Sequence, residues 1–267
     1  MLFADVPVVL RGGGDLATGV GYQLHHAGFP VVVLELEQPL AIRRTVAFST
    51  AVTDGSIVVD GVEAQKVGSP AAALSLARDG VVAVLASPDL PDFGEDLPVL
   101  VDARLAKRNI DTTVQQASLV VGLGPGFTAG VDCHAVVETM RGHRLGRVIW
   151  EGGAAPNTGV PGEIGGASAD RIVRSPGAGV VHWDVSIGDL VVRGDVLGKV
   201  ATTEVTAPID GVVRGLIAPG SSAEPGLKIG DVDPRGDVGA CFEISDKSRL
   251  VGAGVLEAVL TRLNRQA

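Results

Sequence analysis

The sequence predicts an α/β fold, with a parallel sheet in the N-terminal part and a second, smaller all-β domain after it. Three observations lead to this prediction. Short valine-rich apolar runs without polar alternation recur along residues 1–150 and suit buried parallel strands. Helical segments lie between several of these runs, and a glycine-rich turn joins the first run to the first helix. Beyond residue 170 the pattern changes to short strands between turns, arranged as an internal repeat.

Composition and charge narrow the class of protein. With 46% apolar residues among 267, the chain has enough apolar material for a core. The formal charge of −9 argues against nucleic acid and anionic membrane as partners, because both require a basic surface. The start, MLFADVPVVL, lacks the features of a signal peptide, and no apolar run is as long as a transmembrane helix. Two cysteines, Cys133 and Cys241, make no disulfide framework, so we expect a cytoplasmic protein.

A glycine-rich turn follows the first predicted strand, residues 6–10. Gly12, Gly14 and Ala17 match the spacing G-x-G-x-x-G/A. In this pattern the first glycine permits a tight turn, the second lets the backbone approach a pyrophosphate, and the third position keeps helix and strand close. A helix is predicted over residues 15–27, with Gly28 after its end. The strand, turn and helix are typical of a Rossmann-like nucleotide-binding domain, which we place at residues 1–150.

An acidic residue stands where such a domain binds a ribose hydroxyl. The second predicted strand, residues 31–34, ends in Glu35, roughly twenty residues after the turn. Glu37 is the alternative, because it would point to the same face of an extended segment. The candidate cofactor-binding residues here are Gly12, Gly13, Gly14, Asp15, Ala17 and Glu35. The alternative interpretation is a glycine-rich turn in an α/β domain that has lost its ligand.

The middle of the chain continues the α/β pattern. Strands are predicted within 57–67 and over 81–86, 98–101 and 119–121, and Ser69-Pro70 begins a helix. A second glycine loop, with Gly122, Gly124 and Gly126, follows the last of these strands. Since open α/β sheets bind ligands at the carboxyl ends of their strands, these glycines are further candidates for cofactor binding. A turn of unusual backbone geometry explains them equally well.

No metal site is predicted. Cys133 and His134 are adjacent in sequence, which rarely lets both bind one metal, and no further ligands stand at metal spacing. Four basic residues follow that suit phosphate or carboxylate groups but more often form a solvated face: Arg141, His143, Arg144 and Arg147. Residues 151–170, rich in glycine and proline, are predicted to be a linker, with a long functional loop as the alternative.

The segment after this linker repeats itself. A shift of 32 positions lays Pro176 on Pro208 and Gly179 on Gly211, and it aligns three further glycine pairs and two Val-Val dipeptides. Each half alone would leave an apolar face uncovered. We therefore expect the two halves to cover each other as a compact β-domain with approximate two-fold symmetry over residues 171–235.

This repeat resembles the biotinyl/lipoyl-like domains at SPGAGVV, IGDLVVRGDVLGKV and TAPIDGVV. The resemblance implies a barrel-sandwich hybrid fold. Domains of that family carry a modified lysine in the turn between their halves. The corresponding turn here, residues 201–204, contains no lysine, and Lys199 lies before it. The resemblance therefore implies a structural or docking module rather than a covalent carrier.

The last segment, residues 236–267, is predicted to end in an amphipathic helix. Its apolar positions are Leu250, Leu256, Val259, Leu260 and Leu263. The position of this helix after the repeat suggests that it returns to the α/β domain.

Longer motifs resemble one family across almost the whole chain. They are GGGDLATG, RRTVAF, GLGPGF, ETMRGHRLGRVI, NTGVPGEIGG, KIGDVDPRG and ISDKSR. These stretches resemble the YqeB-type family of accessory proteins in selenium-dependent molybdenum hydroxylase systems. The resemblance implies a molybdenum hydroxylase or its maturation proteins as partners. It implies no established catalytic residues.

The leading functional hypothesis combines the family with the glycine turn. Molybdenum hydroxylases use a pterin cofactor that is often a dinucleotide, and a helix N-terminus behind a glycine turn suits its pyrophosphate. We expect an accessory or maturation factor that binds a dinucleotide, either NAD(P) or molybdopterin dinucleotide. One alternative is an NAD(P)-dependent oxidoreductase, for which the sequence offers no convincing Tyr-Lys or His-Asp pair. Another is a non-catalytic docking protein with a relic Rossmann domain. A homo-oligomer is compatible with the sequence.

Cys241 is the candidate catalytic residue. Arg235, Lys247 and Arg249 are near it in sequence and would stabilise a thiolate, the nucleophilic form of cysteine. A thiolate can carry sulfur or selenium by exchange chemistry, which would connect the residue to the family. A buried structural cysteine is the competing interpretation. Cys133, beside His134, is the competing reactive thiol.

Overall fold

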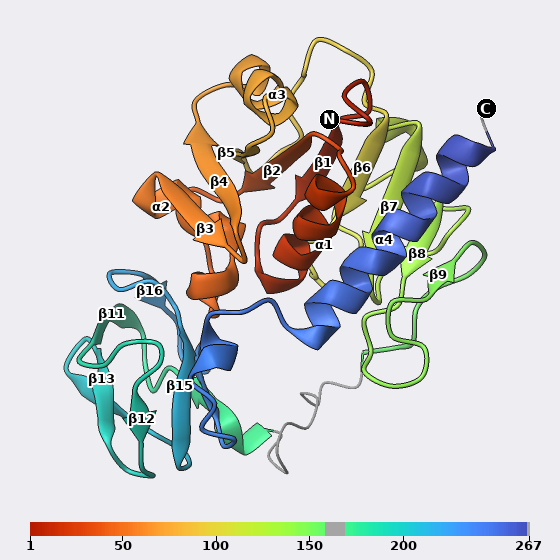
Figure 1. Ribbon diagram of the computed structural model, residues 1–267. Helices are drawn as coiled ribbons and strands as arrows, with labels where there is room; N and C mark the ends of the chain where they lie inside the picture. Colours follow the sequence, from red (N-terminus) through yellow and green to blue (C-terminus); the bar gives the residue numbers. More distant parts are fainter. Residues whose placement is uncertain (158–168, 266–267) are drawn as a thin grey trace. The chain divides into compact units, whose positions relative to one another are not determined.

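The computed structural model describes residues 1–157 and 169–265, and the chain divides into two compact units (Figure 1). The α/β unit contains Met1–Glu37, Ala47–Asn157 and Ile244–Ala267. The β unit contains Gln38–Val46 and the described residues of Thr158–Glu243. Neither unit is one continuous stretch, because the chain enters the β unit twice and returns to the α/β unit each time.

The described part of the α/β unit is built on a nine-stranded sheet of order β3-β4-β5-β2-β1-β6-β7-β8-β9. All neighbouring strands are parallel except in the two edge hairpins, β3–β4 and β8–β9. The strands that precede the inner loops consist mainly of buried apolar residues, as the sequence predicts, and three of them end in a charged residue: Arg11, Glu35 and Asp102. The strand bounds are Val8–Arg11 (β1), Val31–Glu35 (β2), Ser56–Val59 (β3), Val62–Val67 (β4), Val82–Ala86 (β5), Val99–Asp102 (β6), Leu119–Leu123 (β7), Ala135–Val137 (β8) and Val148–Ile149 (β9).

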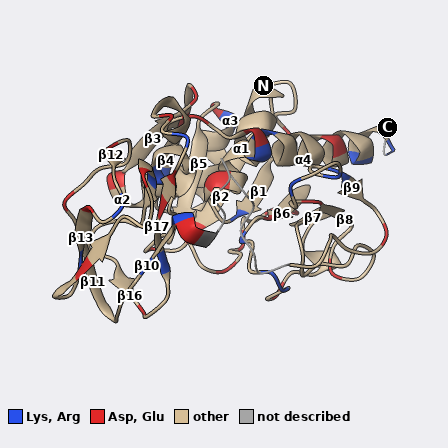
Figure 2. Cartoon of the chain, turned by 90° about the horizontal axis from the view of Figure 1, so that it is seen from below, with Lys and Arg blue, Asp and Glu red and all other residues tan. Residues whose placement is uncertain are grey.

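Helices cover both faces of this sheet. On one face, α1 (Asp15–His26) and α4 (Asp246–Asn264) lie side by side (Figures 1 and 2). On the other face, α3 (Pro70–Arg78) packs against β2 and β5, and its apolar residues join the core cluster that contains Val9, Val32 and Leu100. Ser69 caps α3 by accepting a hydrogen bond from the Ala72 N–H, as the Ser-Pro pair predicts. The short helix α2 (Ala51–Asp54) precedes the β3–β4 hairpin.

The C-terminal helix α4 returns to the α/β unit, and its buried face matches the predicted one only in part, since Val259 is fully buried as predicted. Leu250 is 50% exposed and Leu260 is 41% exposed, whereas Val251 and Val255 are fully buried. Glycines explain the difference. Gly19 of α1 and Gly252 of α4 let the two backbones approach closely, so the buried stripe consists of small residues and valines rather than leucines.

The β unit contains two four-stranded antiparallel sheets in its described part. Their orders are β10-β17-β15-β12 and β14-β13-β11-β16. The strands are Ile172–Arg174 (β10), Gly179–Trp183 (β11), Leu190–Val191 (β12), Val196–Val200 (β13), Thr203–Thr206 (β14), Gly211–Leu216 (β15), Ser222–Ala223 (β16) and Lys228–Asp233 (β17). The 32-residue shift carries β11, β12 and β13 onto the starts of β15, β16 and β17, and β10 onto β14. It therefore converts one sheet order into the other, which is the two-fold relation that the repeat predicts.

The matched glycines occupy matched turns of the two halves. Gly179 and Gly211 have φ values of +152° and +155°, and Gly188 and Gly220 have φ values of +103° and +83°. Residues other than glycine rarely adopt these backbone conformations, which is why the repeat is clearest at its glycines. The apolar residues of both sheets, among them Val181 and Val213, share one core.

The two units differ from the predicted domain bounds at three segments, residues 38–46, 151–157 and 236–243. Each of them belongs to another unit than its place in the sequence predicts. Residues 151–157, predicted to be linker, belong to the α/β unit, where the Ala129 N–H donates to the Gly152 carbonyl over 2.7 Å. Residues 158–168 of the predicted linker lie outside the described residues. Residues 236–243 belong to the β unit rather than to the C-terminal segment. Gln38–Val46 also belongs to the β unit, although the sequence predicts it within the α/β domain. None of the helices in the described ranges is both long enough and apolar enough to cross a membrane.

Candidate nucleotide-binding site

The turn after β1 lies at the centre of the carboxyl edge of the sheet. From β1 the chain proceeds to β2 on one side, and β6 pairs with β1 on the other side. In the order β5-β2-β1-β6-β7, β2 and β5 are added on one side of β1, whereas β6 and β7 are added on the other side. The direction of strand addition therefore reverses between β1 and β6. Open α/β sheets bind their ligands at such a switch point, which is where the glycine turn stands.

The three glycines of the turn differ in what surrounds them. Gly12 has a φ of +101°, and a Cβ there would lie 3.0 Å from the Ala103 carbonyl oxygen, beyond the end of β6. A Cβ on Gly13 would lie 2.8 Å from Val33 Cγ1 and 2.9 Å from the Ser49 nitrogen. A Cβ on Gly14 would meet no atom within 4 Å. Gly12 and Gly13 therefore serve the packing of the turn, and Gly14 leaves open space at the start of α1.

The N-terminus of α1 lacks a side-chain cap within the described part of the chain. Gly14 is the N-cap residue, with φ −71° and ψ −174°, and it has no side chain to accept the first N–H groups. The first backbone bond of the helix runs from the Thr18 N–H to the Gly14 carbonyl. The free backbone N–H groups of the first helical turn and the positive end of the helix dipole thus lie at the space beside Gly14. This arrangement favours the binding of an anion.

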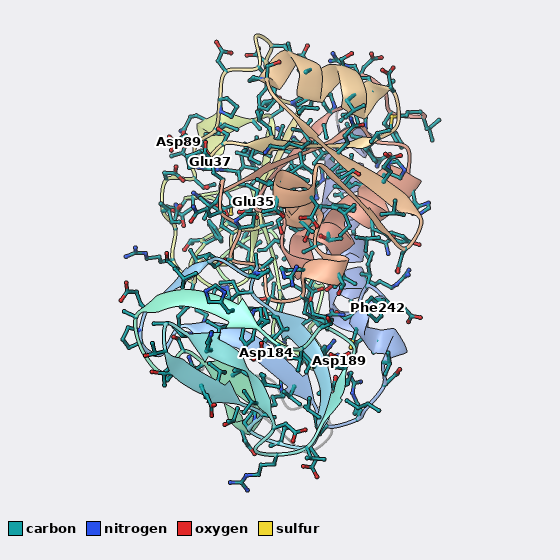
Figure 3. The ribbon with its side chains drawn as sticks, turned by 90° about the vertical axis from the view of Figure 1, so that its left-hand side faces the viewer. Glu35, Glu37, Asp89, Asp184, Asp189 and Phe242 are labelled. Atoms are coloured by element: carbon teal, nitrogen blue, oxygen red, sulfur yellow. The ribbon has the colours of Figure 1, made fainter. Side chains whose placement is uncertain are left out.

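The acidic residue at the end of β2 lies against the same turn. The Glu35 carboxylate accepts hydrogen bonds from the Gly13 N–H at 2.9 Å and from the Leu36 N–H at 2.8 Å. Glu35 is half-buried, and Glu37 is exposed two residues further on (Figure 3). The structure thus brings Glu35 to the glycine turn, while Glu37 makes no hydrogen bond to it within the described residues. Each bond engages one carboxylate oxygen, and further lone pairs stay available for a hydroxyl group.

Two other predicted site residues have structural contacts. The Asp15 carboxylate accepts a hydrogen bond of 2.6 Å from the Ser248 hydroxyl, which links α1 to the first turn of α4. Ala17 is buried at 1% exposure on the helix face that packs on the unit. Ala17 therefore has the packing role that the third position of the fingerprint predicts.

A network of charged side chains borders the turn at the ends of β1 and β6. Arg11 is only 2% exposed, and its guanidinium donates to both carboxylate oxygens of Asp111 at 2.7 and 2.8 Å. Arg104 donates to Asp102 and to Asp111, and the Thr112 hydroxyl donates to Asp102 at 2.6 Å. Hydrogen bonds from Arg11, with those from Arg104, lower the pKa of Asp111 to about 2. The network fastens the segment after β6 across the edge of the sheet.

Sequence reasoning did not find this network, although a signal was present. Arg11 and Asp102 are charged residues at the ends of two otherwise apolar strands, and they are paired in register in the sheet. Two opposite charges at the ends of neighbouring buried strands predict an ion-paired edge. Arg104, Asp111 and Thr112 come from an irregular loop, and their approach depends on the tertiary structure.

The second glycine loop is filled by side chains and backbone of its own unit. A Cβ on Gly122 would overlap the Phe127 ring, and one on Gly124 would overlap the Thr139 hydroxyl. Gly126 has a φ of +109° and lies against the backbone of Arg108. Close packing and backbone geometry account for these three glycines, so the turn after β1 is the better candidate for ligand binding.

The two cysteines do not have the surroundings of reactive thiols. Cys241 is fully buried, and burial raises its pKa although Arg214 and Arg43 lie near enough to oppose the shift. Burial favours the neutral thiol, so these surroundings suit the competing interpretation of a buried structural cysteine, and the catalytic role of Cys241 stays a prediction. Burial also raises the pKa of Cys133, to about 11. Nδ1 of its neighbour His134 accepts a hydrogen bond from the Val120 N–H and so satisfies a backbone donor of β7.

Solved structures give only weak overall similarity. A succinylglutamatedesuccinylase/aspartoacylase from Rhodobacter sphaeroides aligns at 26% identity over 25% of this chain and 22% of its own, with a TM-score of 0.22. The apo structure of the ectoine utilization protein EutE (DoeB) from Ruegeria pomeroyi aligns at 13% identity over 85% of this chain and 86% of its own, with a TM-score of 0.28. Scores this low establish no common fold.

Sequence comparison gives a much stronger result. No family model matches the chain. The chain is 48% identical over 259 residues to "Uncharacterized protein YqeB" of Escherichia coli (strain K12), an alignment that covers 97% of this chain and 48% of the relative. The chain thus spans about half the length of the curated relative it matches. Identity at this level over nearly the whole chain makes the protein a homologue of the Escherichia coli protein YqeB along that half.

Proposed function

We propose that the α/β unit binds the pyrophosphate of a dinucleotide at the glycine turn after β1. The observation that carries this proposal is Gly14: it is the N-cap of α1, no side chain caps the helix in the described residues, and a Cβ there would meet open space. A phosphate in that space would receive N–H groups of the first helical turn. Glu35, bonded to the Gly13 N–H, stands where a ribose hydroxyl would follow.

We further propose that the dinucleotide is the cofactor of a molybdenum hydroxylase and that the protein is an accessory factor in maturation of that enzyme. The sequence resemblance to accessory proteins of selenium-dependent hydroxylase systems supports this role. The turn itself suits the pyrophosphate of molybdopterin dinucleotide and that of NAD(P) equally, because it recognises the phosphate groups rather than the base. The bound ligand therefore distinguishes an accessory factor from an oxidoreductase.

The test uses the Gly14→Val variant. Native mass spectrometry of freshly purified protein, with NAD, NADP or molybdopterin dinucleotide added, identifies the ligand that the wild type retains. Calorimetry then measures its affinity for the variant. We expect Gly14→Val to abolish this binding while the protein stays folded, because valine accepts the φ and ψ of Gly14 but occupies the phosphate position. Valine is a poorer N-cap than glycine, so the thermal midpoint should fall slightly.

Gly68→Val is the matched control. Gly68 also has open space around its Cβ position and needs no left-handed conformation, and it follows β4, away from the switch point. This variant should bind like the wild type. Unchanged affinity in Gly14→Val would reject the site, and retention of none of the three dinucleotides by the wild type would reject the proposed ligand class.

A further inference from the structure

A cavity of about 450 Å³ lies in the α/β unit beside the β8–β9 hairpin, at one end of the sheet. The β8–β9 hairpin supplies Glu138, Arg144, Arg147 and Ile149, and the segment after β9 supplies Ala154 and Pro156. Small-molecule sites typically measure roughly 300–1,000 Å³, so the cavity is large enough for an organic ligand. The mechanism proposed for the glycine turn does not use any of these residues.

A turn fixes the backbone of the two arginines in the cavity, but their guanidinium groups have no partner among the described residues. The Arg147 N–H donates to the Arg144 carbonyl at 3.0 Å, and the Arg147 carbonyl accepts the Glu138 N–H at 3.0 Å. These bonds fix the backbone from which both side chains leave. Both residues are exposed, and no residue within 1–157 or 169–265 forms a hydrogen bond or ion pair with either guanidinium. Basic segments lie beside β9 in Figure 2.

Glu138 is the acidic residue of the cavity, and its carboxylate is already engaged. It is 3% exposed, and its two oxygens accept the Met140 N–H at 2.7 Å and the Ala155 N–H at 2.8 Å. The bond from Met140 lies within the hairpin, and the bond from Ala155 joins the hairpin to the segment after β9, so Glu138 holds the two walls together. Among the described residues Glu138 forms no hydrogen bond or ion pair with Arg144 or Arg147, so both guanidinium groups can pair with an external anion. The charge of the lining residues is positive overall.

The remaining walls are apolar. Ile149 and Ala154 are partly buried and pack against the core cluster beneath them, and Pro156 adds a rigid ring. A free inorganic ion would leave these walls in contact with water. A ligand that joins an anionic group to an apolar body would use both parts of the cavity.

We propose that this cavity binds a phosphate monoester with an apolar body. Two guanidiniums three residues apart on one turn match a dianion better than a single carboxylate. β8 lies three strands from β1, about 14 Å at the spacing of sheet strands. The cavity is thus a second site at the same sheet edge, and its occupation does not depend on a ligand at the glycine turn.

The test is calorimetry of the full chain with phenyl phosphate, benzoate and inorganic phosphate. We expect one site for phenyl phosphate, with weaker binding of benzoate and of inorganic phosphate. Arg144→Gln and Arg147→Gln should each weaken phenyl phosphate by at least about tenfold, the usual effect of losing a hydrogen bond to a charged group. Arg193→Gln removes the same charge from an exposed position of the β unit and should change nothing.

Three results would overturn the proposal. The first is wild-type affinity for phenyl phosphate in both arginine variants, or no binding of it to the wild type. The second is benzoate or inorganic phosphate binding as tightly as phenyl phosphate, which would remove the dianion or the apolar body from the ligand. The third is loss of phenyl phosphate binding in Gly14→Val, which would place the anion at the glycine turn. A failure of the dinucleotide proposal with intact phenyl phosphate binding would leave the second site standing.

Discussion

The buried charges at the switch point find their partners within the α/β unit itself. Arg11 and Asp102 are almost fully buried, and each is held by at least two hydrogen bonds from or to the segment after β6. A buried charge without a partner costs several kcal/mol, so these bonds determine where that segment can lie. The backbone of Ala103 in turn limits Gly12 to glycine. The charge network therefore shapes the turn that we assign to pyrophosphate binding.

The two members of the Arg11–Asp111 pair should contribute unequally to stability. Asp111→Asn leaves the buried Arg11 without its carboxylate, and we expect a loss of about 2 kcal/mol in the free energy of unfolding. This figure is below the usual cost of breaking a buried pair because the Asp111 side chain is 44% exposed. Arg11→Met should cost less, because Asp111 can then be hydrated and keeps Arg104. Urea unfolding followed by circular dichroism measures both.

The pH dependence of the same variant provides the control. Asp111 has a pKa of about 2 in the folded protein, below its usual 3.8. A lowered folded pKa stabilises the protein fully above the unfolded pKa, and this stabilisation is lost as the pH falls from about 4 toward 2. The gap between wild type and Asp111→Asn should therefore narrow over that interval. A gap that stays constant from pH 6 to pH 2.5 would contradict the ion-pair explanation.

At the scale of elements, the packing of α1 on α4 depends on glycine. A Cβ on Gly19 would overlap the Ser248 carbonyl oxygen, and one on Gly252 would overlap the Gly19 carbonyl oxygen. The Ser248 hydroxyl also donates to Asp15 at the start of α1. The contact thus fixes the helix whose N-terminus forms the candidate site.

The sequence predicts these elements well and their contact poorly. Caps, glycines and valine runs locate α1, α3 and the inner strands within a few residues, because those signals are local. The face of α4 was predicted from its leucines and is partly wrong. The burial of Val251 and Val255 follows from two glycines that are far apart in sequence, and nothing local indicates that they meet.

Gly19→Ala should destabilise the α/β unit, contrary to the usual effect of this substitution in a helix. Alanine in place of glycine within a helix normally adds about 1 kcal/mol of stability. Here the added Cβ forces the helices apart, and overpacking of this kind costs about 2 kcal/mol. Thermal unfolding of Gly19→Ala beside Gly68→Ala, whose Cβ has open space, measures the difference. A higher midpoint for Gly19→Ala than for the wild type would mean that the helices are not in close contact.

At the scale of the whole molecule, the two units are interleaved in sequence. The 32-residue repeat predicts the two sheets of the β unit, because each half carries its own turns and valines. The membership of Gln38–Val46 in that unit could not be predicted in this way, since the segment lies more than 100 residues before the repeat and has no counterpart in it. It is recognised only by its tertiary contacts.

Those contacts are specific and numerous enough to make the segment part of the β unit's fold. Ile42 packs against the apolar core, and its backbone lies against Gly215. Arg43 donates to the carbonyls of Ala240 and Glu243, and Arg44 donates to the Leu216 carbonyl at 2.7 Å. Thr45 bonds the Cys241 carbonyl at 2.6 Å. Removing the segment would expose part of the core and leave several carbonyl groups without donors.

We therefore expect residues 158–243, produced alone, to unfold at lower urea concentration than the same fragment joined through a flexible linker to residues 38–46. The joined fragment recovers the packing of Ile42 and the donors from Arg43, Arg44 and Thr45. Trp183, which donates to the Ile217 carbonyl, reports unfolding by fluorescence. A joined fragment carrying Ile42→Ser, Arg43→Gln, Arg44→Gln and Thr45→Val matches the linker and chain length without these contacts, and it should behave like residues 158–243 alone. Equal midpoints for all three fragments would show that the β unit folds from the repeat without this segment.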